Sequence, residues 1–86
     1  MKLKDGFILR TVAGETVALP SNGVTDLDMM ISLNDTARLL WERLVVGAEQ
    51  EELVQALLAE YAVSRETAEN SVAAFTARLK ELDFLE

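Results

Sequence analysis

The side chains that could do chemistry in this 86-residue sequence are mainly carboxylates, because it contains neither histidine nor cysteine. Catalytic triads and dyads that use these two residues are therefore impossible, and the usual transition-metal sites are excluded. Neighbouring carboxylates do occur, such as Asp26 with Asp28 and Glu49 with Glu51 and Glu52. A general acid needs a carboxyl group in a dry cleft, whereas these positions fit a solvated loop and the first turn of a helix. We expect no catalysis by this chain alone.

The composition indicates one globular domain over residues 1–86. Half of the residues are hydrophobic and 27% are charged, which is ordinary for a soluble fold with room for a single core. No apolar run approaches the roughly 20 residues that span a bilayer, and the start "MKLKDGF" lacks the apolar run of a signal peptide. With no cysteine, these features predict a cytoplasmic protein that has no membrane contact and no cofactor.

The elements that must position any site begin with strands. The segments "FILRTV" (7–12) and "TVALP" (16–20) predict a β-hairpin, because they are rich in β-branched and apolar residues and Gly14 lies between them. The stretch "MMISL" (29–33) predicts a third strand that barely alternates between apolar and polar residues. Side chains of a strand alternate between its faces, so one of Met29 and Met30 points to the core and the other to the surface. The sequence leaves open which.

Three helices follow, at about 35–46, 49–61 and 65–82. The first carries apolar residues at i, i+3, i+4 and i+7, which places Trp41 in the core. Either Asn34 or Asp35 can cap its start, and Ser64 can cap the third helix. Three strands followed by three helices predict an α+β fold, with the helices on one face of a three-stranded antiparallel sheet. We expect a meander that leaves the third strand on an edge.

Several segments, taken in order, resemble one known family. They are "FILRTVAGETVALP", "ISLNDTARLLWERL", a glutamate-rich segment that ends "LLAEYAVS", and "VAAFTARLKELDFLE". Together they are similar to the PqqD-like family, which is named for pyrroloquinoline quinone biosynthesis and has standalone relatives in peptide-modifying gene clusters. The similarity runs from about Phe7 to Glu86, and its most specific part is "ISLNDTA" (31–37) followed by Trp41. One departure is Asp83, where the family commonly has a glycine.

The resemblance implies a winged helix-turn-helix-like domain that acts as a peptide chaperone. In the family, this domain binds the leader of a ribosomally made precursor peptide and presents the peptide to a modifying enzyme, often a radical S-adenosylmethionine (SAM) enzyme. The leader lies as an extra strand beside the third strand, and its side chains enter the groove between that strand and the third helix. Carried over residue by residue, the resemblance implies a peptide-binding site of Met29, Met30, Ile31, Ser32, Leu33, Thr67, Ala68, Ser71, Val72 and Phe75.

The residues themselves favour such a site on physical grounds. An edge strand usually needs charges or proline to block pairing with another chain, and residues 29–33 contain neither. An extended peptide can add to such an edge. Thr67, Ser71 and Ala74 form a stripe of small residues on the third helix, which would let another chain come close.

Two other functions fit the same elements. The open edge could serve a structural subunit that dimerises or swaps strands, and a monomer or a weak homodimer is compatible with the sequence. A winged-helix DNA-binding domain would share the fold class. The net charge of −7, with its acidic excess in residues 34–86, counts against a nucleic-acid partner because acidic surfaces repel phosphates.

Overall fold

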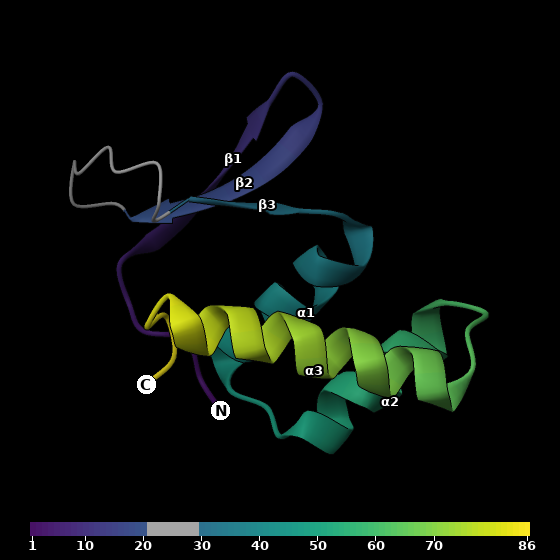
Figure 1. Ribbon diagram of the computed structural model, residues 1–86. Helices are drawn as coiled ribbons and strands as arrows, with labels where there is room; N and C mark the ends of the chain where they lie inside the picture. The colour runs from purple at the N-terminus through teal and green to yellow at the C-terminus, as the bar shows by residue number, and fades with distance from the viewer. Residues whose placement is uncertain (21–29) are drawn as a thin grey trace.

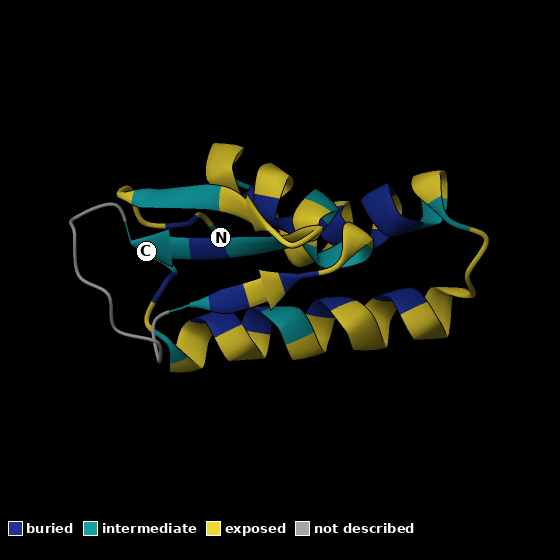
Figure 2. Ribbon diagram, turned by 90° about the horizontal axis from the view of Figure 1, so that it is seen from above, coloured by how far each residue is buried: buried dark blue, intermediate teal, exposed yellow. Residues whose placement is uncertain are grey.

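Three strands precede three helices in the computed structural model, which describes residues 1–20 and 30–86 (Figure 1). The helices lie on one side of the sheet, and α3 runs alongside β3 in both ribbon views (Figures 1 and 2). The α+β class and the antiparallel three-stranded sheet are therefore confirmed. The elements are β1 (Phe7–Val12), β2 (Glu15–Pro20), β3 (Ile31–Leu33), α1 (Asp35–Val46), α2 (Gln50–Glu60) and α3 (Arg65–Glu81).

The sheet is a meander in the order β1-β2-β3, which places β3 on an edge as expected. A two-residue turn joins β1 to β2, and both Ala13 (φ 52°) and Gly14 (φ 82°) have positive φ. This is the type I′ turn that matches the twist of a hairpin. The third strand is shorter than expected: it begins at Ile31, Met30 lies just before it, and Met29 lies outside the described residues.

Side-chain caps fix where the helices begin. Asn34, rather than Asp35, is the cap of α1, because its Oδ1 accepts the Ala37 N–H at 2.9 Å. Ser64 caps α3 as expected, with its Oγ accepting the Thr67 N–H at 3.1 Å. These bonds satisfy backbone donors that have no partner within the helix. Asn34 is the single residue between the end of β3 at Leu33 and the start of α1 at Asp35. The edge strand is therefore directly connected to the helix.

The core lies between the sheet and the three helices and contains an aromatic cluster. Trp41 is buried as predicted, and Phe84 is fully buried. The Phe7 ring lies 4.4 Å from the Phe84 ring and 5.7 Å from the Trp41 ring, measured between centroids. Such tilted and edge-to-face arrangements add stability beyond the buried area. The cluster ties β1, α1 and the C-terminal segment together.

The two ends of the chain pair with each other, a feature the sequence pattern did not predict. Leu3 forms a β-bridge with Leu85 and is buried. The Lys4 N–H donates to the Phe84 carbonyl at 2.9 Å, and the Glu86 N–H donates to the Lys2 carbonyl at 2.8 Å. The termini therefore lie together in Figure 1. Within the described residues, no helix is both long and apolar enough to cross a membrane.

Candidate functional site

The free edge of β3 is defined by the hydrogen-bonding parity of the sheet. In a type I′ hairpin the residues that flank the turn, here Val12 and Glu15, face each other as a hydrogen-bonded pair. Backbone groups of successive strand residues point to opposite sides, so those of Val17 also face β1. Pro20 agrees with this parity, because it faces away from β1 and has no N–H to donate.

The same alternation carries over to β3. The backbone groups of Thr16 and Ala18 point away from β1, and their partners in the register are Leu33 and Ile31. These two β3 residues therefore direct their N–H and C=O groups to β2. The backbone groups of Ser32 point the other way, toward an edge on which no described strand pairs. Ser32 is thus the residue of β3 whose backbone is open to another strand.

An open groove of about 320 Å³ lies next to this edge, between the β3–α1 junction and α3. Its floor is apolar, with Ala37 and Leu40 from α1 and Phe75 from α3. Small side chains on α3 keep it open, since bulky ones at Ser71 and Ala74 would fill it. Figure 2 shows the β3 and α3 ribbons side by side. The groove residues are Asn34, Thr36, Ala37, Leu40, Ser71, Ala74 and Phe75.

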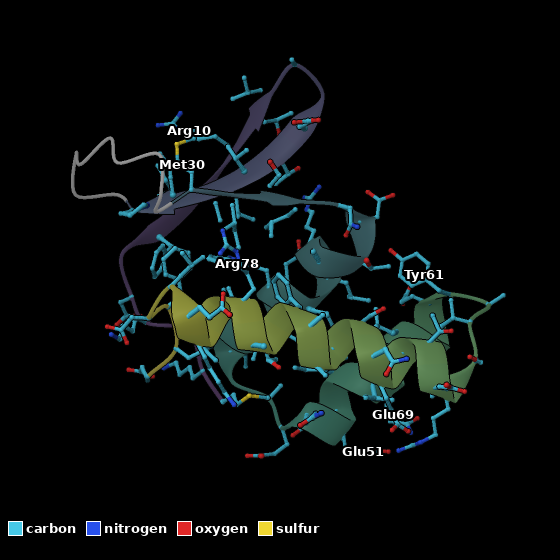
Figure 3. The ribbon with its side chains drawn as sticks, in the orientation of Figure 1. Arg10, Met30, Glu51, Tyr61, Glu69 and Arg78 are labelled. Carbon is cyan, nitrogen blue, oxygen red and sulfur yellow. The ribbon has the colours of Figure 1, made fainter. Side chains whose placement is uncertain are left out.

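The β3 residues of the predicted site divide between core and surface. Ile31 and Leu33 are 8% and 6% exposed and pack into the core, so only their backbones are near a surface. The Ser32 side chain is exposed, and Met30 is half-buried. Figure 3 shows Met30 beside Arg10 on the face of the sheet away from the helices. Met29 lies outside the described residues.

The α3 residues of the predicted site divide in the same way. Ser71 and Phe75 line the groove, and Thr67 is exposed one turn before Ser71. Ala68 and Val72 are fully buried and belong to the core, so the structure does not bring them to the groove surface. Helical spacing explains the difference, because positions 68 and 72 lie one residue round the helix from positions 67 and 71.

Other groove residues escaped prediction. Asn34 was predicted only as a possible helix cap, and Ala37 and Leu40 belong to the apolar face of the first helix; with Thr36, they form the wall that faces α3. Ala74 was noted as part of the small-residue stripe and does line the groove. Whether the first turn of α1 is open on this side depends on how α1 and α3 pack in three dimensions. A sequence pattern does not contain that information.

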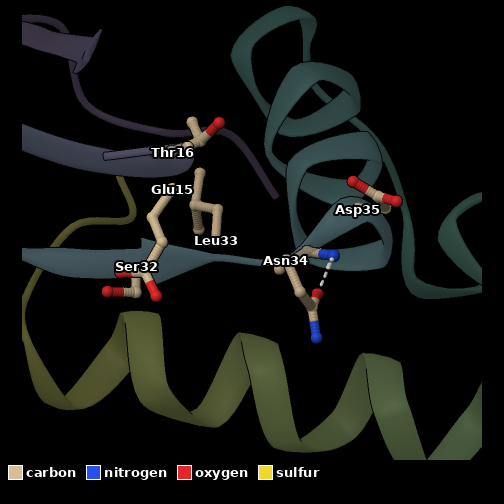
Figure 4. Close-up of a pocket in the computed structure, with 8 residues that line it drawn as sticks. Glu15, Thr16, Ser32, Leu33, Asn34 and Asp35 are labelled. Atoms are coloured by element: carbon tan, nitrogen blue, oxygen red, sulfur yellow. Dashed lines mark hydrogen bonds between the residues drawn. The ribbon is translucent and has the colours of Figure 1, made fainter. Parts of the chain in front are cut away.

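A second hollow, of about 550 Å³, lies at the C-terminal end of β3. Figure 4 shows the Glu15 side chain reaching from the start of β2 over Ser32, with Asp35 at the start of α1. Ser32, Leu33 and Asn34 line this hollow too. The Ser32 edge thus has a hollow with two carboxylates at one end and the apolar groove along its side.

Charged groups in the described part of the chain form ion pairs at the surface. The resolved pKa shifts belong to an exposed ion pair between α2 and α3: hydrogen bonding to Arg65 lowers the pKa of Glu51, and the same contact raises that of Arg65. This pair lies at 2.6 Å and joins the two helices. Among residues 1–20 and 30–86, no group of three or more acidic side chains is arranged to hold a metal ion.

Comparisons with known proteins identify the family of this chain and similar folds. The family model described as coenzyme PQQ synthesis protein D (PqqD) matches residues 15–85, which confirms the resemblance found in the sequence. The structure titled "TbiB1 in Complex with the TbiA(beta) Leader Peptide" is 30% identical, with a TM-score of 0.76 over 100% of this chain and 95% of that one. The structure titled "Lasso peptide synthetase B1 complexed with the leader peptide" is 31% identical, with a TM-score of 0.70 over 93% of this chain and 89% of that one. No curated protein matches the chain.

Proposed function

We propose that this chain, which belongs to the coenzyme PQQ synthesis protein D (PqqD) family, is a non-catalytic element that binds the leader of a ribosomally made precursor peptide. The observation that carries the proposal is the outer edge of β3 at Ser32, on which no described strand pairs, together with a nearby open apolar groove. Two solved neighbours of about 30% identity are complexes with leader peptides, which supports the same role here.

Binding would proceed by strand addition. The leader lies along β3 and exchanges backbone hydrogen bonds with Ser32. Alternate side chains of the leader then point toward the helices, where Ala37, Leu40 and Phe75 form the apolar floor of the groove. Each apolar side chain that fills the groove contributes about 1.5–3 kcal/mol before the leader's ordering cost is subtracted. Affinity in the micromolar range follows, about −8 kcal/mol.

After binding, the chain would present the core of the precursor to a modifying enzyme. The leader is held at the edge by its backbone, so the rest of the precursor stays free to enter an active site elsewhere. The family resemblance points to a radical SAM enzyme as that partner. Co-purification of the chain with a candidate enzyme, with and without leader peptide, would test this part separately.

Amide exchange of the labelled protein tests the binding mode. In the free protein, the Ile31 and Leu33 N–H groups should exchange slowly because they pair with β2, and the Ser32 N–H should exchange quickly. Addition of a bound peptide should protect Ser32 and shift the groove residues of α1 and α3. Suitable probes are the TbiA(beta) leader, which the 30% identical neighbour binds, and peptides selected by the chain from a displayed library. Peptide binding that leaves Ser32 exchange unchanged would contradict strand addition.

Two rival functions make different predictions. A DNA-binding helix should carry an excess of basic groups, but α3 has as many acidic as basic side chains, and its Arg65 is held by Glu51 and by Glu69 at 2.8 Å. Dimerisation through the β3 edge would use the same backbone groups as the leader. Light scattering separates this case, because a dimer that persists at saturating peptide would argue against the leader as the occupant of the edge.

A further inference from the structure

Side chains of opposite charge lie near the two ends of β3. The N-terminal end of β3 lies near the C-terminal half of α3, which carries Arg78, and the C-terminal end lies near Glu15 and Asp35 (Figures 3 and 4). From position 30 to position 34 an extended strand covers about 13 Å. A peptide that lies along β3 would therefore meet a cation and two carboxylates within about four of its own residues.

Helical spacing directs Arg78 to the groove. Ser71 and Ala74 line the groove, and Arg78 follows Ala74 by four residues, so it lies on the same side of α3 one turn later. Figure 3 shows its side chain rising from α3 toward the sheet. The guanidinium is half-exposed, and its Glu81 partner is 3.7 Å away, beyond the length of a hydrogen bond. A carboxylate of a bound peptide can compete for it.

The acidic end is built from two elements. Glu15 starts β2 and Asp35 starts α1, and both line the hollow at the end of β3. The nearby Arg38 does not neutralise them, because its Nε lies 3.3 Å from Glu42. The N-terminus of α1 offsets about half of one unit charge, which leaves this end negative.

We propose that the bound leader segment carries an acidic side chain where it passes Arg78 and a basic side chain where it passes Glu15 and Asp35, about three to five residues apart. The inference rests on the proposed function and adds the class of peptide that fits. Backbone hydrogen bonds at Ser32 are indifferent to sequence, and the apolar groove accepts many side chains. The charge pair then sets the register of the leader on a strand too short to set it by itself.

A displayed library of random 15-residue peptides tests the proposal without knowledge of the natural leader. The immobilised full chain should enrich peptides with an acidic and a basic position at this spacing. Arg78→Glu should remove the acidic preference or turn it into a basic one. The matched control is Lys80→Glu, which makes the same change of net charge at an exposed position two residues further along α3. This control should leave the selected pattern unchanged.

A second set of variants tests the acidic end of β3, and a change in the peptide measures how much one charge contributes to the Kd. Glu15→Lys combined with Asp35→Lys should remove or reverse the basic preference. For one selected peptide, exchange of its acidic residue for lysine should weaken the Kd for the parent chain by about two- to fivefold. The Arg78→Glu chain should bind the exchanged peptide better than the original.

The outcomes separate this inference from the function on which it rests. One possible result is that Ser32→Pro abolishes peptide enrichment, whereas Arg78→Glu and Lys80→Glu select the same pattern of charges. This result overturns the charge rule and leaves strand addition intact. Failure to enrich any peptide, or enrichment unaffected by Ser32→Pro, overturns both.

Discussion

Proline substitutions within β3 should separate peptide binding from folding, because adjacent residues direct their N–H groups to opposite sides. The Ser32 N–H faces the free edge, so Ser32→Pro removes no hydrogen bond of the sheet. We expect its free energy of unfolding to lie within about 1 kcal/mol of that of Ser32→Ala. Peptide binding should be lost in Ser32→Pro and retained in Ser32→Ala, which keeps the N–H.

The next residue should behave in the opposite way. The Ile31 N–H pairs with the carbonyl of Ala18, a fully buried residue. Ile31→Pro leaves that carbonyl without a hydrogen-bond donor, which lowers the free energy of unfolding by about 1–3 kcal/mol in addition to the effect of the lost side chain. Ile31→Ala measures the side-chain part alone, about 2–5 kcal/mol. A domain of this size has about 4–13 kcal/mol in total, so a combined loss of about 3–8 kcal/mol should leave Ile31→Pro much less stable than Ser32→Pro.

Urea denaturation followed by circular dichroism measures the four free energies of unfolding, and fluorescence anisotropy of a labelled peptide measures binding. The decisive quantity is the difference between proline and alanine at each position. If this difference is as large at Ser32 as at Ile31, the assignment of the free edge is wrong. If Ser32→Pro folds and still binds peptide with unchanged Kd, strand addition at this edge is refuted.

Three further predictions concern the scaffold. Phe84→Ala should lower the free energy of unfolding by about 3–5 kcal/mol, because it removes a fully buried ring that contacts two others; a urea titration in which it loses less than 1 kcal/mol would show that the aromatic cluster is not a stabilising centre. Ala13→Gly should raise the same quantity by about 1 kcal/mol, since Ala13 has φ 52° in the hairpin turn; an unchanged thermal midpoint would count against strain there. The pKa of Glu51, measured by carboxyl NMR, should lie below its ordinary value and return toward it in Arg65→Met. Because the folded-state pKa is the lowered one, the stabilisation from this pair is present at neutral pH and is lost as pH falls through that pKa.

The elements of the fold were predictable from local signals. The glycine turn with its flanking β-branched residues fixed the hairpin, and Asn34 and Ser64 marked the helix starts because their side chains satisfy free backbone donors. The apolar stripe around Trp41 placed α1 on the core. These features depend on residues within one or two turns of each other, so a sequence pattern can carry them.

Features that join distant segments were not predictable in the same way. The bridge between Leu3 and Leu85 pairs the two ends of the chain. Neither end has an alternating apolar pattern that predicts this pairing. The apolar spacing of the third helix is compatible with the burial of Ala68 and Val72, but the groove position of Ala37 and Leu40 depends on how the elements pack against each other. The family resemblance pointed to β3 and α3, whereas the three-dimensional packing decides which of their side chains face the groove.

Asp83 shows how a single departure from a family pattern is absorbed. The residue has φ 59°, a left-handed conformation that glycine adopts without strain and that explains why the family commonly has glycine there. Its carboxylate lies 2.9 Å from the Lys4 ammonium, and this contact joins the two ends of the chain at the point where Lys4 bonds to Phe84. The aspartate thus accepts backbone strain at a position where its charge has a partner.

The shortness of β3 has two consequences that belong together. An open edge of three residues offers few backbone groups, which limits unwanted pairing with other chains even though no charge or proline protects it. The same shortness means that backbone bonds alone cannot select one peptide over another or fix its register. Selection must then come from what surrounds the strand: the apolar groove with Phe75 at its side, and the charges at its two ends. If the chain binds leaders as proposed, it would discriminate among them by side chains while holding each of them by the backbone.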